Sequence, residues 1–142
     1  MKSTYSLLIS LLLACGVTAA ELSIYDGRVR ESIPGQNVSA GYLTLHNGGA
    51  KDCELLAVSS ADVPRIEVHE HRHAHGMMQM RKVESLIVPA AGKVVFSSGG
   101  HHLMLLDLPN PLRSGASLML RFDFGVCGTL EETFPVVVAG GG

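Results

Sequence analysis

The sequence lacks the features that mark several common functional classes. Lys and Arg number 11 against 13 Asp and Glu, a formal net charge of −2 at pH 7, so nothing points to a nucleic acid or another polyanion as partner. Beyond the N-terminal residues the chain has no apolar run of membrane length, and we do not expect a membrane-spanning protein. No serine or cysteine nucleophile stands in a recognisable catalytic motif, which argues against an enzyme.

The first residues have the layout of a secretory signal peptide. Lys2 supplies positive charge, residues 7–14 form an uncharged apolar run, and the small residues that follow allow cleavage after Ala19 or Ala20. We therefore predict a signal peptide over residues 1–20, export to the periplasm and one mature domain over residues 21–142. Cys15, in the sequence LLAC, leaves a rival interpretation in which this cysteine is lipidated and anchors the protein.

Cysteine is scarce, and only Cys53 and Cys127 remain after the predicted leader. An even pair in an oxidising compartment favours a disulfide. One alternative is a pair of metal-binding thiolates, although neither cysteine has a His or Met close by in the sequence. The other is a redox pair, although the two residues do not form a C-x-x-C motif.

The mature chain also lacks long helical periodicity, internal repeats and any linker that would divide it. Instead, short alternating segments are separated by Gly, Pro, Asn and Asp, a pattern typical of a β-sandwich or barrel. We predict an all-β domain with a Greek-key sandwich architecture. Its expected strands are residues 22–30, 39–47, 54–59, 65–69, 77–83, 86–88, 93–96, 101–106, 117–124 and 133–138.

Histidine and methionine are concentrated in two segments, residues 68–81 (VHEHRHAHGMMQMR) and 99–104 (GGHHLM). Soft thioethers favour Cu(I), while imidazole accepts copper in either oxidation state. A site of two Met and two His would therefore select copper, mainly as Cu(I). A single Met in a strand usually fills space in the hydrophobic core. We expect this role for Met119, and it is the alternative to metal binding for Met77 and Met78.

Strand geometry supports part of such a site. Residues two apart project from the same face of a strand, so His102 and Met104 can contact one ion while Leu103 points into the core. Gly99 and Gly100 allow a sharp turn just before this pair. His69 ends another apolar strand and Met80 follows in the next segment, so three separate places could converge at one end of a sandwich.

The spacing of these residues resembles the signature of the periplasmic PCu(A)C-type copper chaperones. His69 and Met80 are separated by ten residues, 21 more lie before His102, and one residue separates it from Met104. Flanking segments such as residues 41–47 (GYLTLHN) and 76–81 (GMMQMR) are similar to the family as well. The resemblance implies a cupredoxin-like β-sandwich that binds one Cu(I) per chain through these four side chains.

The resemblance also implies a role in carrying copper across the periplasm, notably toward the copper centres of cytochrome c oxidase. The expected partner is a copper-accepting protein, such as a cytochrome c oxidase subunit or another assembly chaperone. The main alternative is copper storage or resistance, in which the same site buffers the metal without delivering it. Electron transfer is disfavoured, because a blue-copper site needs a cysteine thiolate beside two histidines, and none stands near His102.

Three further histidines depart from the family pattern. His71, His73 and His75 alternate along what we expect to be an extended loop, and they could form a second, weaker site for Cu(II). The alternative is that they are solvated loop residues. His101 is expected to face away from His102 in a regular strand, which leaves it a role in orienting a ligand at most.

Overall fold

The computed structural model describes residues 21–140. The predicted signal peptide and Cys15 lie outside the described residues. Within them, eleven strands and one short 3-10 helix make up the regular structure, and no helix is long and apolar enough to cross a membrane. The elements are β1 (Leu22–Arg30), β2 (Ser39–Asn47), β3 (Cys53–Leu55), β4 (Ala57–Ser59), β5 (Arg65–Ala74), β6 (Met77–Val83), β7 (Leu86–Val88), β8 (Gly92–Phe96), β9 (His101–Leu106), β10 (Ser117–Asp123), η1 (Gly125–Cys127) and β11 (Thr129–Val137).

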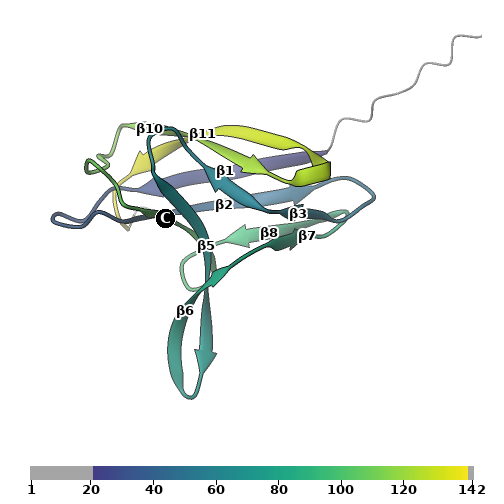
Figure 1. Ribbon diagram of the computed structural model, residues 1–142, viewed down its shortest axis with the longest axis horizontal. Helices are drawn as coiled ribbons and strands as arrows, with labels where there is room; N and C mark the ends of the chain where they lie inside the picture. The colour runs from purple at the N-terminus through teal and green to yellow at the C-terminus, as the bar shows by residue number, and fades with distance from the viewer. Residues whose placement is uncertain (1–20, 141–142) are drawn as a thin grey trace, which may run out of the picture.

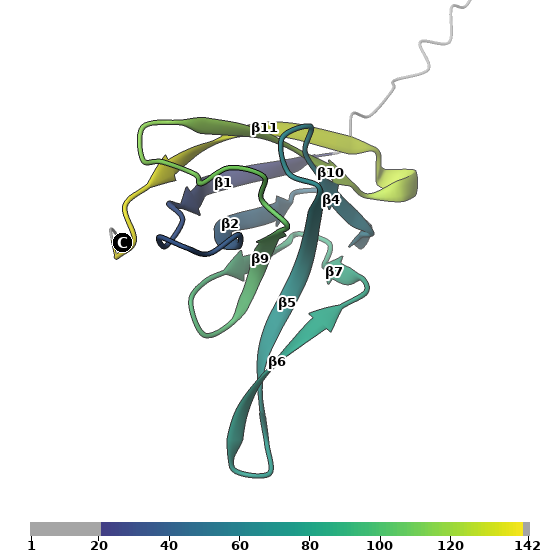
Figure 2. The same cartoon turned by 60° about the vertical axis from the view of Figure 1, so that its left-hand side comes forward.

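Nine strands form one sheet in the order β4-β10-β11-β1-β2-β8-β9-β5-β6, and β2 also pairs with β9. Strands β3 and β7 form a separate two-stranded sheet. Figures 1 and 2 show β10 and β11 along one side of the body, β8 and β9 toward the other, and β1 and β2 between them. One cluster of buried apolar side chains includes residues from both sides, so the sheet curls around a single core. The predicted all-β class is confirmed.

Alternation along the strands builds this core. In β10, Leu118, Leu120 and Phe122 are buried and the residues between them are exposed, which is the period-two pattern of a strand with one face in the core. Met119 is 50% exposed. The expectation that it fills the core is therefore wrong, because its position in the alternation places it on the outer face. Met77 and Met78 are exposed as well.

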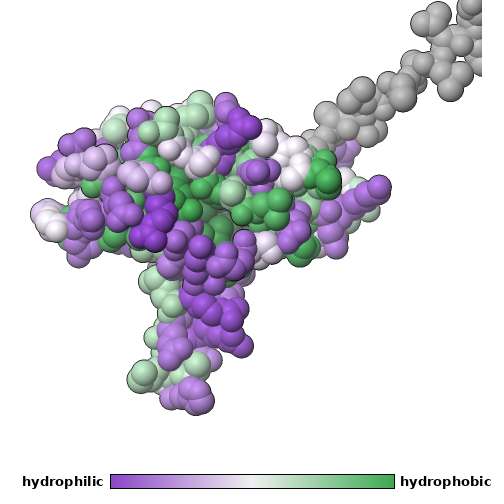
Figure 3. Space-filling model, viewed as in Figure 1, coloured by the Kyte–Doolittle hydropathy of each residue, from purple (hydrophilic) through white to green (hydrophobic). Residues whose placement is uncertain are grey.

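The β5–β6 hairpin extends beyond the sandwich as an arm (Figures 1 and 2). Strand β5 continues to Ala74, whereas we expected it to end at His69 and to be followed by a loop. Residues 70–74 have no apolar alternation, but pairing with β6 from Val68 to Ala74 satisfies their backbone. The hairpin turns at His75 and Gly76, both with positive φ, at 52° and 75°, as type I′ turns require. Figure 3 shows this arm as a largely hydrophilic projection.

Strand β9 is the element that joins the arm to the core. Gly99 precedes it with φ 84°, a conformation that favours glycine. The strand pairs with β5 along its length and with β2 at its end. Leu103 and Leu105 are fully buried, so His102 and Met104 project from the opposite face, as expected.

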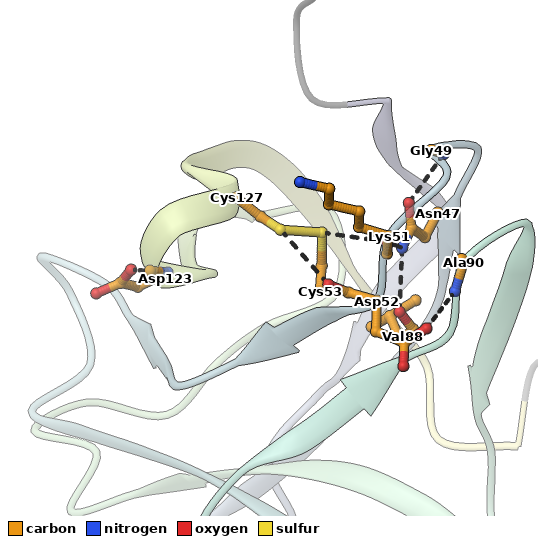
Figure 4. Close-up of a disulfide and its surroundings, with 10 residues drawn as sticks. Asn47, Gly49, Lys51, Asp52, Cys53, Val88, Ala90, Asp123 and Cys127 are labelled. Carbon is orange, nitrogen blue, oxygen red and sulfur yellow. Dashed lines mark hydrogen bonds between the residues drawn. A yellow bond between two sulfur atoms is a disulfide. The ribbon is translucent and has the colours of Figure 1, made fainter.

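A disulfide joins Cys53 in β3 to Cys127 in η1, across a sequence separation of 74 residues (Figure 4). The surrounding loop is held by the buried side chain of Asn47, whose Nδ2 donates to the carbonyls of Lys51 and Val88 at 2.7 and 3.1 Å. The Asp52 carboxylate accepts a hydrogen bond from the backbone of Ala90 at 2.9 Å. Neither cysteine lies on the strands that carry the histidines.

Candidate metal site

The register between β5 and β9 brings together residues that lie more than 30 positions apart in the chain. His69 is directly opposite His102, and Glu67 is directly opposite Met104. Directly paired residues project from the same face of a sheet, and residues two apart on one strand do so as well. Glu67, His69, His102 and Met104 therefore share one face, opposite the buried Leu103.

The register between β5 and β6 adds Met80 from the other side. Met80 is directly opposite His71, and Lys82 is opposite His69. Strand β5 lies between β6 and β9 in the sheet, so Met80 is one strand farther from His102 than His69 is. His71 occupies the position between them on the same face. Of the four predicted ligands, the structure thus places His69, His102 and Met104 at neighbouring positions and Met80 beyond His71.

The separations of the imidazole rings are compatible with a shared ion. The ring centroids of His69 and His102 are 6.0 Å apart, and those of His71 and His102 are 5.1 Å apart. With metal–nitrogen bonds of about 2.0–2.1 Å, two imidazoles on one ion have centroids at most about 6.4 Å apart. Both pairs fall within this limit.

Hydrogen bonding determines which nitrogen of His69 is available to a metal. Its Nε2–H donates to Oε2 of Glu67 at 2.8 Å. Its Nδ1 is buried and has no hydrogen-bond partner among the described residues. An unpaired buried acceptor is costly, and a metal ion bound to Nδ1 would satisfy it. A carboxylate that accepts the other ring proton is the usual companion of a metal-bound histidine.

His102 uses the opposite nitrogen for its hydrogen bond. Its Nδ1–H donates to the carbonyl of Gly100 at 3.2 Å, which leaves Nε2 as the donor toward a metal. The side chain is buried, with the residue 4% exposed. Burial lowers the pKa of His102, the Gly100 hydrogen bond opposes this, and the nearby His71, His69 and His101 lower it further. The neutral imidazole, which is the form that binds metals, is therefore favoured.

Glu67 is anchored in place by its neighbours. Its carboxylate lies 3.3 Å from Arg65 and 3.8 Å from Lys82, in addition to the hydrogen bond with His69. The hydrogen bond from His69 lowers the pKa of Glu67, and the charges of Lys82 and Arg65 act in the same direction against the effect of burial. The carboxylate stays ionised at neutral pH and makes the His69 ring a stronger donor.

The donor set on this face is soft. Two thioethers and two or three imidazoles suit a soft monovalent ion better than Mg²⁺ or Ca²⁺, which take oxygen ligands. Within residues 21–140, no three His, Cys, Asp or Glu side chains already converge as a metal centre. The thioethers of Met80 and Met104 are not among those residue types, and both residues are on the same face as His69 and His102.

The three extra histidines differ in burial and in position along the arm. His71 is half-buried beside His102, whereas His73 and His75 are exposed. His73 is directly opposite Met78, one step farther along the arm, and His75 is in the turn. We expected these residues on a loop, but His71 and His73 belong to β5 because the hairpin pairing continues to its tip.

His101 faces the other side of the sheet from His102, as expected. Its Nε2 is 3.5 Å from Oε2 of Glu70, and Glu70 also pairs with Arg81 at 3.0 Å. The Glu67–His69 pair within β5 and the Glu70–His101 pair between β5 and β9 thus lie on opposite faces of the sheet. Only the pair of Glu67 and His69 is on the face that carries the predicted ligands.

Sequence reasoning missed Glu67 as a partner of His69. The available signal was its position two residues before His69, which places both side chains on one face of a strand. The position of His71 between Met80 and His102 had no comparable signal, because it depends on the register of two strand pairs.

The fold is that of PCuAC domains. The chain superimposes on a "Copper-bound PCuAC domain from PmoF2" with a TM-score of 0.71 at 18% identity, covering 84% of this chain and 95% of that one. The copper(I) form of DR1885 from Deinococcus radiodurans matches with a TM-score of 0.66 at 23% identity, covering 89% and 85%. These likenesses confirm the cupredoxin-like sandwich that the resemblance implied.

The chain belongs to the LpqE-like family, described as "Putative lipoprotein LpqE-like", whose model matches residues 22–136. A relative from Rickettsia prowazekii, itself uncharacterized, is 32% identical over 87 residues, which are 61% of this chain and 48% of that one. A lipoprotein relative from Leifsonia xyli subsp. xyli is 28% identical over 107 residues, 73% and 61% of the two chains. The chain thus spans about half to three-fifths of these relatives.

Proposed function

We propose that this protein binds copper(I) and carries it outside the cytoplasm. The ligands are His69, Met80, His102 and Met104, with one Cu(I) per chain. The observation that carries the proposal is the pairing of His69 with His102 on a face that also holds Met104, with the buried Nδ1 of His69 lacking a hydrogen-bond partner within residues 21–140. The copper-bound structures that share the fold support the same interpretation.

The chemistry of the donors selects the ion and its oxidation state. Thioether sulfur is neutral and soft, so it stabilises Cu(I) and binds hard divalent ions weakly. Cys53 and Cys127 do not supply a thiolate to this site, because they are joined in the disulfide. A site of neutral donors holds Cu(I) as a +1 centre and can release it to a partner.

The exposure of the arm favours transfer over storage. Met80 is 51% exposed on the outermost strand of the sheet, whereas His102 is buried. A partner can therefore approach copper from the side of Met80 and replace this ligand first. We propose delivery to a copper-accepting protein, such as a cytochrome c oxidase subunit or another assembly chaperone. The role is binding and transfer, not catalysis.

Export is part of the proposal. A signal peptide over residues 1–20 would place the domain in the periplasm, and the lipoprotein relative and the description of the family support export. The same comparisons leave lipidation of Cys15 as the second route to a location outside the cytoplasm. Mass spectrometry of the processed protein distinguishes them, because cleavage after Ala19 or Ala20 removes Cys15.

The decisive experiment is an anaerobic titration of the exported, processed protein with Cu(I) in competition with a coloured Cu(I) chelator. We expect one tightly held Cu(I) per chain. Replacing His102 by Ala together with Met104 by Leu should abolish this binding. The Met104→Leu change alone conserves volume and should cost less than about 1.5 kcal/mol of stability in the metal-free protein.

Met119→Leu is the matched control, because Met119 is exposed on β10, away from the arm. It should leave Cu(I) affinity unchanged. If the parent protein and the His102→Ala/Met104→Leu variant compete equally for Cu(I), or if neither competes, the proposed function is wrong. Delivery is then tested by mixing the Cu(I)-loaded protein with a soluble copper-accepting domain of cytochrome c oxidase, whereas a storage protein would retain the metal.

A further inference from the structure

We infer that His71 is a third imidazole of the copper site and that it enables this one site to hold Cu(II) as well as Cu(I). The inference rests on the proposed function, because it adds a ligand to the same site. It replaces the expectation of a separate Cu(II) site made by His71, His73 and His75. The chain would then carry one copper ion in either oxidation state, not two ions in two sites.

The position of His71 carries the inference. It lies two residues after His69 on β5, the strand between β9 and β6, and directly opposite Met80 on β6. Its backbone N–H donates to the carbonyl of Gly100, two residues before His102, at 3.4 Å. Its ring is 5.1 Å from that of His102, closer than the 6.0 Å that separates the rings of His69 and His102.

The ring of His71 is within the separation of about 6.4 Å that allows two imidazoles to share one ion, as the ring of His69 is. Met80 can reach an ion at His102 only across β5, which lies between β6 and β9, and His71 is the β5 residue directly opposite Met80. His71 is also half-buried, unlike the exposed His73 and His75. Because three histidines do not yet converge as a metal centre within residues 21–140, the inference requires the His71 side chain to rotate toward Nε2 of His102 when the ion binds.

A third imidazole changes which oxidation states the site accepts. Cu(I) is satisfied by few soft donors, and His69, His102 and the thioethers supply them. Cu(II) prefers a tetragonal set of nitrogen and oxygen donors, which two imidazoles and two thioethers do not provide. Three imidazoles, with Glu67 hydrogen-bonded to one of them, bring the site closer to that preference.

The test is a Cu(II) titration of the exported, processed protein, followed by electron paramagnetic resonance, with and without one equivalent of Ag(I). Ag(I) is a soft monovalent ion that stands in for Cu(I) without redox exchange. We expect one Cu(II) per chain with nitrogen hyperfine structure, and we expect Ag(I) to block its binding. The His71→Ala variant should lose at least about tenfold in Cu(II) affinity while keeping most of its Cu(I) affinity.

The matched control is His73→Ala, two residues along the same strand on the same face, which should leave both affinities unchanged. His71→Gln serves as a second variant, and thermal unfolding of the metal-free protein verifies that both variants fold. The inference is overturned if the parent protein binds no Cu(II), if His71→Ala keeps full Cu(II) affinity, or if Ag(I)-loaded protein still binds Cu(II). A protein that binds Cu(II) through His71 but no Cu(I) would contradict the proposed function and, with it, the shared site, and would leave only the role of His71 as a Cu(II) ligand.

Discussion

The hydrogen bond between Glu67 and His69 assigns the roles of the two nitrogens of a partly buried imidazole. Because Nε2–H donates to the carboxylate at 2.8 Å, Nδ1 is left as the unpaired acceptor. His102 has the reverse arrangement, with Nδ1–H donating to Gly100. The two facing histidines thus offer different nitrogens to a shared ion, and each ring is held by a protein acceptor on its other side.

We expect Glu67→Gln to lower Cu(I) affinity by about 10- to 100-fold, the usual cost of removing a partner that orients a metal-bound histidine. The amide keeps the volume of the side chain but loses the charge that strengthens the imidazole as a donor. Competition with a Cu(I) chelator measures the effect. Glu70→Gln is the matched control, because Glu70 pairs with His101 on the other face of the sheet. Equal losses in both variants would contradict a specific role for Glu67.

The lowered pKa of His102 also predicts how the stability of the metal-free protein depends on pH. The ordinary pKa of histidine is near 6.5. Between that value and the lower folded pKa, the unfolded chain binds more protons than the folded one. The free energy of unfolding should therefore fall as the pH decreases below about 6.5.

Urea denaturation at a series of pH values from 7.5 to about 5 measures this decline. In His102→Gln the decline should be smaller, since this residue no longer takes up a proton on unfolding. The lowered pKa of Glu67 acts in the same direction but only in more acidic solution, near and below its ordinary value of 4.5. An unchanged pH dependence in the variant would show that His102 is not the group responsible.

The arm formed by β5 and β6 carries two of the predicted ligands, His69 and Met80. Its two strands pair histidines with methionines, with His73 opposite Met78 and His71 opposite Met80. Its three methionines are exposed and it buries little apolar surface. Its order therefore depends on the hairpin pairing and on the contact of β5 with β9. The turn at His75 and Gly76 is therefore important for keeping Met80 in register with His71.

We expect His75→Asn to stabilise the arm, by less than about 1 kcal/mol. His75 has a positive φ of 52°, and Asn tolerates this conformation better than other residues with a side chain. Hydrogen exchange of the β6 amides should slow in this variant, and the affinities for Cu(I) and Cu(II) should not change. Gly76→Val is the opposing change, because a β-branched residue is strained at φ 75°, and β6 amides should exchange faster. A loss of Cu(II) binding in His75→Asn would restore the expected role of this histidine as a ligand.

At the scale of the whole molecule, the disulfide and the curled sheet hold together parts of the chain that are distant in sequence. Cys53 and Cys127 close a loop with a separation of 74 residues. The strands that carry the predicted ligands, β5, β6 and β9, all lie within this loop. The disulfide therefore stabilises the domain that supports the site without contributing a donor to it.

We expect the Cys53→Ala/Cys127→Ala variant to lose about 4 kcal/mol of stability, from the entropy of closing a loop of this length. Chemical denaturation of the metal-free protein measures the loss. Cu(I) affinity should be unchanged under conditions where the variant is folded, since both cysteines lie off the three strands of the site. Loss of Cu(I) binding by the folded variant would show that the cysteines contribute to the site, as in the thiolate alternative.

The sequence by itself determined the fold class and the types of donor side chain from which a metal site is predicted. Alternation of apolar and polar residues produces strands, as in β10 and β9, and the period of two places His102 and Met104 on one face with Leu103 in the core. The types of donor side chain are independent of structure, so a preference for a soft metal was already evident. The expected end of β5 at His69 was wrong because pairing with β6, and not apolar alternation, continues the strand.

Only the tertiary structure decided which of these side chains meet. His69 and His102 face each other because of the register between β5 and β9, and no local pattern encodes the alignment of two strands so far apart in the chain. The same register leaves Nδ1 of His69 buried and unpaired and sets His71 between Met80 and His102. Periodicity fixes the face of a residue within its own strand, whereas its neighbours across the sheet depend on the packing of the whole core.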